Sequence, residues 1–103
     1  MAKPIAKIPL KKIKVGINWV DQERIIVHHS KKGEIRACRN VCRHMYGLFV
    51  EQGGSELICM RHGWTLDPAT MTYNSPAAGA KQEELLVEIT KTHVILYDAP
   101  EQK

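Results

Sequence analysis

Two short Cys/His pairs constrain this chain more than any other feature of its sequence. Cys42 and His44 have one residue between them, and Cys59 and His62 have two. Such spacers place each pair on a tight loop, and two loops that face each other bring four ligands together. A single zinc is one candidate, but zinc modules usually pair like ligands with like. One cysteine and one histidine on each loop suits a binuclear centre with chemically different ends, one iron taking the cysteines and the other the histidines.

Length and composition limit what else the chain contains. With 103 residues it is expected to form a single domain with one modest core. Its interspersed charged and apolar residues predict neither disorder nor a membrane span. The basic start lacks the apolar region and cleavage site of a secretory signal, and three cysteines do not make a disulfide framework. We therefore expect a cytoplasmic protein with no membrane attachment.

The net charge of +4 has two interpretations. Its basic residues gather in the sequences KKIK and HHSKKGEIRACR, which could bind nucleic acid. No aromatic residues are interleaved with them, however, as a single-strand binding surface would require. The composition favours a solvated surface with a preference for acidic protein partners over nucleic acid.

Most of the remaining sequence predicts β structure, and no stretch has helical periodicity over three turns. An edge strand is predicted at KPIAKIPL, a hairpin at RIIVHH-SKKGE-EIRAC, and a second hairpin at LLVEIT and HVILYD. Between the hairpins, residues 38–81 are rich in glycine, proline and metal-type ligands, and they predict a long irregular segment. A bound cofactor that organises the loops would explain such a segment in a small domain.

The complete motif resembles that of the Rieske family. The family signature is C-x-H, a gap, and then C-x-x-H followed by glycine and an aromatic residue, and the gap here spans residues 45–58. The resemblance implies a mostly β Rieske fold, with an antiparallel β-sheet base and an inserted cluster-binding subdomain at about 38–80 of a single 1–103 domain. It also implies one 2Fe-2S cluster per chain, and the ligands would be Cys42, His44, Cys59 and His62. The sequence SPAAG (75–79) matches the proline loop that covers the cluster in such domains.

Within that family, one group is more similar still. The sequences ACRNVCRH, GLFVE, HGWTLDPATMTYNSP and EELLVEI resemble the N-terminal Rieske domain of CMP-N-acetylneuraminate hydroxylase and its bacterial relatives. In those proteins a much larger domain, related to metal-dependent hydrolases, follows. The resemblance therefore covers the electron-transfer part alone, as a free-standing ferredoxin or as part of a longer protein.

The same resemblance implies a low reduction potential. High-potential members have a serine and a tyrosine that donate hydrogen bonds to the cluster, and Trp64 and Leu66 occupy those positions here. High-potential loops are also clamped by a disulfide, whose positions correspond to Gly47 and Arg61. Rieske potentials span roughly −150 to +300 mV, and we expect a value near the lower end.

The function predicted from these features is one-electron transfer, without enzymatic activity of the chain itself. We expect a monomer that takes electrons from a reductase and passes them to an oxygenase or hydroxylase, through acidic docking surfaces on its partners. The docking face would be the tip that bears His44 and His62, with Met45, Tyr46 and Trp64 nearby. One alternative is an electron-transfer domain or subunit of a CMP-sialate-hydroxylase-like enzyme, and a second is a zinc-stabilised binding module.

Other residues with ligand chemistry have simpler interpretations. Cys38 falls on the strand before the first loop and is expected to be a buried structural thiol. His28 and His29 are adjacent on a strand, face opposite sides, and cannot serve one metal. His93 begins a strand with no partner at ligand spacing, and Trp19 is expected to pack beside the core.

Overall fold

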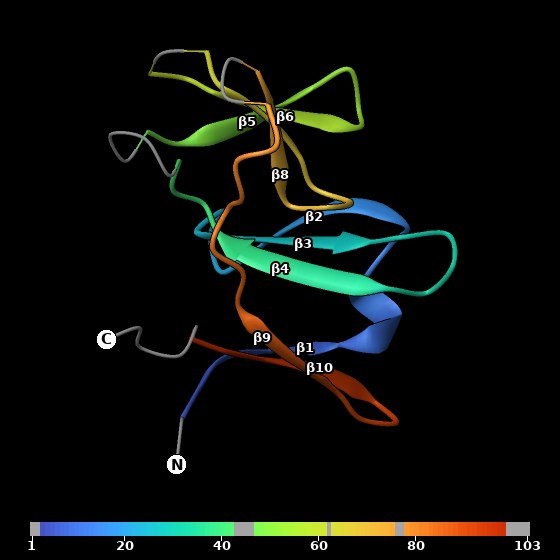
Figure 1. Ribbon diagram of the computed structural model, residues 1–103. Coiled ribbons are helices and arrows are strands. Elements are labelled where there is room, and N and C mark those ends of the chain that lie inside the picture. The colour runs from blue at the N-terminus through green and yellow to red at the C-terminus, as the bar shows by residue number, and fades with distance from the viewer. Residues whose placement is uncertain (1–2, 43–46, 62, 76–77, 99–103) are drawn as a thin grey trace.

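The protein is built from short antiparallel strands that form three stacked sheets, as the computed structural model shows (Figure 1). The structure describes residues 3–42, 47–61, 63–75 and 78–98. In chain order, the strands and the one 3-10 helix of these residues are β1 (Pro4–Pro9), η1 (Leu10–Lys12), β2 (Gly16–Val20), β3 (Ile25–His29), β4 (Ile35–Arg39), β5 (Phe49–Gln52), β6 (Glu56–Cys59), β7 (Thr65–Asp67), β8 (Thr72–Ser75), β9 (Leu86–Ile89) and β10 (His93–Tyr97). No helix in the described part of the chain is long and apolar enough to cross a membrane.

Each of the three sheets consists of strands that pair in a single row. The terminal sheet is β1-β10-β9, the middle sheet is β2-β3-β4, and a four-stranded sheet runs β5-β6-β7-β8. Figure 1 shows the middle sheet between the other two. All the strand pairs are antiparallel. The mostly β, antiparallel fold predicted from the sequence is confirmed.

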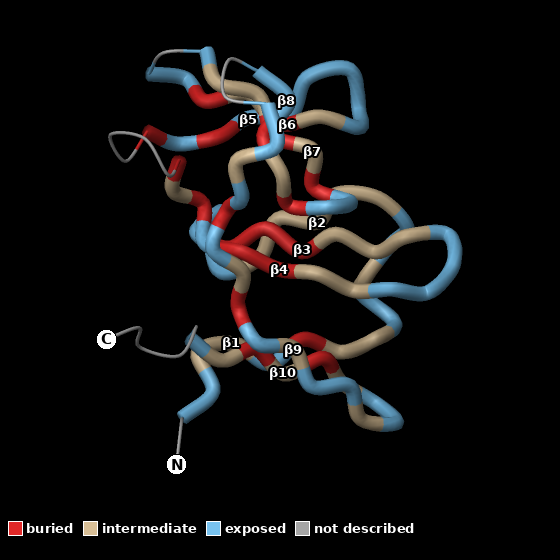
Figure 2. Tube along the Cα trace, viewed as in Figure 1, coloured by how far each residue is buried: buried red, intermediate tan, exposed pale blue. Residues whose placement is uncertain are grey.

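The middle sheet is covered on both faces, which explains the continuous apolar run at the start of β3. Ile26 pairs with Cys38 of β4, and both side chains belong to the core on the side of the four-stranded sheet. The neighbouring residues Ile25, Val27 and Ala37 belong to the core on the side of the terminal sheet. Successive strand residues point to opposite faces, so the part of a strand that lies between two cores is apolar on both faces. Figure 2 shows this burial along β3 and β4.

The two cores divide the buried apolar residues between them. The core toward the terminal sheet is formed by Ile8, Ile25, Val27, Ala37, Leu85, Val94 and Leu96. The other core lies toward the four-stranded sheet and is formed by Ile26, Cys38, Cys42, Phe49, Leu57, Cys59, Leu66, Met71 and Tyr73. Two cysteines of the sequence motif, Cys42 and Cys59, therefore belong to the second core.

The strand predictions were correct at the ends of the chain and wrong in its middle. β1 is an edge strand, and β3-β4 and β9-β10 form the two predicted hairpins. The irregular segment predicted at 38–81 instead contains the four strands β5 to β8, and β2 was not predicted at all. Strands of three or four residues are too short to display a period-2 pattern, so their sequences resemble loops. The division into one 1–103 domain with a subdomain at about 38–80 stays a prediction.

Candidate metal centre

The two cysteines of the motif begin loops that are closed in the same way. The backbone amide of Cys42 donates a hydrogen bond to the carbonyl of Gly47 at 2.6 Å. The amide of Cys59, the last residue of β6, donates to the carbonyl of Trp64 at 2.7 Å. In both loops the bond joins a cysteine to the residue five positions later. The described ends of the two expected loops are therefore joined by the same kind of bond.

Strand pairing brings the two loops together. Phe49 at the start of β5 pairs with Cys59 at the end of β6, and the amide of Met60 donates to the carbonyl of Leu48 at 2.8 Å. The backbone of Gly47 lies so close to the second loop that a Cβ atom there would be 2.3 Å from Cys59 Sγ. Glycine at this position permits the first loop to lie directly against the sulfur of the second.

The described residues contain the sulfur half of the predicted site. Cys42 and Cys59 are buried in one core and form no disulfide. His44 and His62 lie outside the described residues, so the four-ligand set stays a prediction. Within the described ranges, no group of three or more histidine, cysteine or acidic residues could hold a metal. Two buried thiols of one core, without a disulfide, suit the thiolate end of an iron-sulfur centre, since soft sulfur ligands are those that iron-sulfur clusters use.

A tyrosine that the sequence analysis did not select lies beside the first cysteine. The hydroxyl of Tyr73, on β8, is 3.9 Å from Cys42 Sγ and donates a hydrogen bond to Gln82 Oε1 at 2.5 Å. Its ring is buried and packs edge-to-face against Trp64, with centroids 5.3 Å apart. Trp64 and Leu66 supply no hydroxyl, but β8 brings the hydroxyl of Tyr73 near Cys42 Sγ. The sequence feature that could have identified this residue was its position at the end of LDPATMTY.

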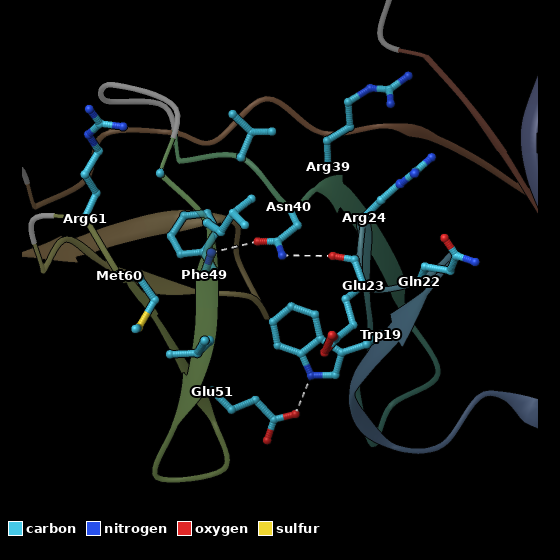
Figure 3. A pocket seen from close by; sticks show the side chains of 14 residues that line it. Trp19, Gln22, Glu23, Arg24, Arg39, Asn40, Phe49, Glu51, Met60 and Arg61 are labelled. Atoms are coloured by element: carbon cyan, nitrogen blue, oxygen red, sulfur yellow. Dashed lines mark hydrogen bonds between the residues drawn. The ribbon is translucent and has the colours of Figure 1, made fainter.

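A second polar residue fixes the segment before Cys42. The side chain of Asn40 is buried, donates from Nδ2 to the carbonyl of Glu23 at 2.9 Å, and accepts at Oδ1 from the amide of Phe49 at 2.8 Å. Glu23 belongs to the β2–β3 turn and has a φ of 67°, the left-handed conformation that non-glycine residues rarely adopt. Figure 3 shows both bonds. Asn40 thus connects the middle sheet to β5 immediately before the first loop.

The third cysteine differs from the other two in its position. Cys38 lies within β4, as predicted, and is completely buried. Burial raises the pKa of its thiol to about 12, although a hydrogen bond with Gln82 opposes this rise and the nearby Glu84 adds to it. Cys38 therefore stays a neutral thiol at physiological pH, as expected of a buried structural cysteine.

The histidines of β3 show no sign of a second metal site. His28 and Asp67 line a polar groove between the middle and four-stranded sheets. Burial lowers the pKa of His28, while Asp67 opposes this change and His29 adds to it. Neither histidine belongs to a metal-binding group within the described residues.

The positions that correspond to the disulfide of high-potential relatives are neighbours in space. A Cβ at Gly47 would lie 2.8 Å from Cβ of Arg61. Leu66 is completely buried in the core, and Trp64 is partly buried against it. These residues hold the loops by close packing.

An open groove of about 900 Å³ runs beside the two loops (Figure 3). Leu48 and Met60 contribute large exposed apolar side chains to it, and Trp19 donates from Nε1 to Glu51 Oε1 across its wall at 2.8 Å. Its basic residues are Arg24, Arg39 and Arg61. Of these, Arg39 is paired with Asp98 at 2.5 Å, whereas Arg24 and Arg61 have no ion pair among the described residues.

Comparisons with known proteins agree with this geometry. The family model described as Rieske [2Fe-2S] domain matches residues 2–94. Cytidine monophosphate-N-acetylneuraminic acid hydroxylase of Macaca mulatta is 31% identical over 99 residues, which cover 89% of this chain and 17% of the hydroxylase. The chain thus spans about a sixth of the length of the curated relatives it matches.

Solved structures show the same fold. The ferredoxin of carbazole 1,9a-dioxygenase from Nocardioides aromaticivorans IC177 has a TM-score of 0.66 and 18% identity, over 95% of this chain and 100% of that chain. The Sphingomonas yanoikuyae B1 ferredoxin has a TM-score of 0.63 and 22% identity, with the same coverage. The antiparallel base with an inserted cluster-binding part, expected from the resemblance, is confirmed at the level of the fold.

Proposed function

Because the chain belongs to the Rieske [2Fe-2S] domain family, we propose that it carries single electrons to an oxygenase- or hydroxylase-type partner. The cofactor of this family, and therefore of this chain, is a 2Fe-2S cluster. We assign no catalysis to the chain itself. A cytoplasmic location, a monomeric state and a reductase as electron donor are part of the same proposal.

One observation supports the proposal, namely two buried cysteines of one core whose amides are bonded in the same way to the residue five positions later. Cys42 and Cys59 each donate their backbone amide within their own loop. The missing side chain of Gly47 lets the two loops lie against each other at Cys59 Sγ. This arrangement, with no disulfide between the two cysteines, is what two sulfur ligands of one centre would require.

The proposed ligands are Cys42 and Cys59 for one iron and His44 and His62 for the other. When bound, a cluster of this type accepts and releases one electron. The chain's own contribution is to bury the thiolates, orient them by backbone hydrogen bonds, and exclude water from them with the packed rings of Trp64 and Tyr73.

Three features support a low reduction potential. Trp64 and Leu66 have no hydroxyl to donate to a sulfur, and Gly47 faces Arg61 where a clamping disulfide would be. The Tyr73 hydroxyl near Cys42 already has a close acceptor in Gln82. Hydrogen bonds to the sulfurs stabilise the reduced form and raise the potential, so the missing hydroxyls at positions 64 and 66 and the competing acceptor at Gln82 favour a low one.

The purified protein is expected to be coloured, with two irons and two acid-labile sulfides per chain. The reduced form should give the EPR signal of a 2Fe-2S centre, and redox titration should place its midpoint near the low end of the roughly −150 to +300 mV family range. A colourless protein that contains zinc would contradict the proposal in favour of a zinc-stabilised module. A clearly positive midpoint would contradict only the low potential.

The match to CMP-N-acetylneuraminic acid hydroxylases favours a second candidate function. About a third of the aligned residues are identical to those of the hydroxylases, although the matched region is only 17% of their length. The chain would then be the electron-transfer part of a CMP-sialate-hydroxylase-like enzyme. An immunoblot of native cell extract distinguishes the two candidates, because an enzyme domain would be found in a polypeptide several times larger.

The groove beside the loops supports acidic docking partners. Arg24 and Arg61 line it together with the exposed apolar side chains of Leu48 and Met60. Apolar side chains beside unpaired arginines are typical of surfaces that bind proteins, and Arg is enriched at such sites. An acidic partner would be attracted to this side of the cluster loops.

Reversing the charge of Arg24 and Arg61 should change the rates at which charged reagents react with the cluster. In the double variant Arg24→Glu/Arg61→Glu, oxidation of the reduced protein by ferricyanide, an anion, should be about tenfold slower at low salt, since local charge steers such encounters. Oxidation by hexaammineruthenium(III), a cation, should become faster. Stopped-flow absorbance over a range of salt concentrations measures both rates.

A matched control isolates the position of the charge. The variant Lys32→Glu/Lys91→Glu changes two lysines in the β3–β4 and β9–β10 turns. Both double variants reduce the net charge from +4 to zero. Equal effects of the two on the ferricyanide rate would show that total charge alone matters, and would contradict steering by the groove.

A further inference from the structure

Gln82 is a buried polar residue that joins the first cysteine loop to the tyrosine beside it. Its exposed fraction is 7%, and it lies on the segment between β8 and β9. Its backbone amide donates to the carbonyl of Met71 at 2.8 Å. Its side chain donates from Nε2 to the carbonyl of Val41 at 2.7 Å and accepts at Oε1 from the Tyr73 hydroxyl at 2.5 Å. Both ends of the amide are therefore engaged.

The orientation of this amide is determined by its partners. A backbone carbonyl can only accept, so the group that faces Val41 must be the NH₂ of Gln82. Its oxygen then faces Tyr73 and can only accept. Turning the amide over would place two acceptors against each other at Val41. The Tyr73 hydroxyl consequently faces an acceptor whose position cannot change.

Among the described residues, the Tyr73 hydroxyl lies near two acceptors, Gln82 Oε1 and Cys42 Sγ, and it has one hydrogen to donate. Gln82 Oε1 is 2.5 Å away, within the range of a strong O–H···O bond, and Cys42 Sγ is 3.9 Å away, at the outer limit for sulfur. The difference in distance places the hydrogen on the side of Gln82. The hydroxyl then presents mainly oxygen lone pairs to the sulfur.

We infer that Gln82 is a positioning residue which keeps the hydroxyl hydrogen of Tyr73 away from the Cys42 thiolate, and so lowers the electron affinity of the site. The inference rests on the proposed role of Cys42 as a cluster ligand. A hydrogen bond to a ligand sulfur is stronger when the sulfur carries more negative charge, so it favours the reduced form. By accepting that hydrogen itself, Gln82 prevents this stabilisation.

Three variants test the inference: Gln82→Met, Tyr73→Phe and the double variant. Methionine is unbranched and of similar length, and it removes the strong acceptor. The buried hydroxyl should then turn to Cys42 Sγ, which raises the equilibrium constant for one-electron reduction about tenfold, or 59 mV. Tyr73→Phe alone should change that constant by less than about threefold. The double variant should resemble Tyr73→Phe, because the increase requires the hydroxyl.

Redox titration measures the constants, and iron analysis with the visible spectrum shows beforehand that each variant holds a cluster. A wild-type protein without a cluster would refute the proposed function rather than this inference. An unchanged reduction constant in Gln82→Met would overturn the inference. An increase that persists in the double variant would also overturn it, because the loss of the bond to Val41 would then be the cause.

Tyr73→Phe keeps the inference testable if Gln82→Met does not fold. A tenfold lower equilibrium constant for one-electron reduction in Tyr73→Phe would mean that the hydroxyl already donates to Cys42 in the wild type. That result would contradict the inference. ENDOR spectra of the reduced proteins in H₂O and D₂O add an independent readout. The couplings of exchangeable protons should be the same in the wild type and in Tyr73→Phe, and the loss of one in the variant would overturn the inference.

Discussion

Cys59→Ala is expected to purify without iron or acid-labile sulfide, whereas Cys38→Ala should retain both. The two thiols are buried and free, and they belong to the same core, so the comparison separates ligation from packing. Cys59 ends β6 at a loop whose backbone bonds orient it, and Gly47 lies directly against its sulfur. Cys38 lies within β4, and its pKa of about 12 keeps it a neutral thiol.

The two variants should also differ in stability. Cys38→Ala leaves a small cavity and should cost roughly 1 kcal/mol in the free energy of unfolding. Cys59→Ala should cost more, because cofactor binding and folding are coupled in small metal domains. Iron and sulfide analysis, visible spectra and thermal unfolding followed by circular dichroism measure both effects. Full iron content in Cys59→Ala, or none in Cys38→Ala, would contradict the ligand assignment.

The parts of the site that could be predicted are those encoded by local spacing. The intervals from Cys42 to His44 and from Cys59 to His62 predicted two tight loops, and each loop is closed by a hydrogen bond from its cysteine amide. The apolar residues of β3 likewise predicted a strand, and its position between two cores explains why the pattern does not alternate.

The parts that could not be predicted depend on contacts between distant segments. Tyr73 and Gln82 lie 31 and 41 positions from their partners Cys42 and Val41, and no sequence period relates such pairs. Asn40 is close to Cys42 in sequence, but its role depends on Glu23 and Phe49 from two other segments. A polar residue that forms a buried connection has the same local sequence signal as one in an exposed turn.

Gly47→Ala should lose its iron as well as part of its stability. The new Cβ would lie 2.3 Å from Cys59 Sγ and 2.8 Å from Cβ of Arg61, and Arg61 Cβ is not the end of a flexible chain that could move aside. Either the first loop or the sulfur of Cys59 must move. Overpacking of this kind costs about 1–3 kcal/mol, and here it also displaces a proposed ligand.

Gly54→Ala is a matched control with a different physical cause. Gly54 lies in the turn between β5 and β6 with a φ of +81°, and a Cβ there would meet no atom within 4 Å. The left-handed conformation alone should cost about 1–2 kcal/mol, without disturbing either cysteine. The two variants should therefore unfold at similarly lowered temperatures, while only Gly47→Ala lacks iron. If Gly54→Ala also lost its iron, general destabilisation would account for the iron loss of both variants. The close contact of Gly47 with Cys59 would then have no specific role in cluster binding.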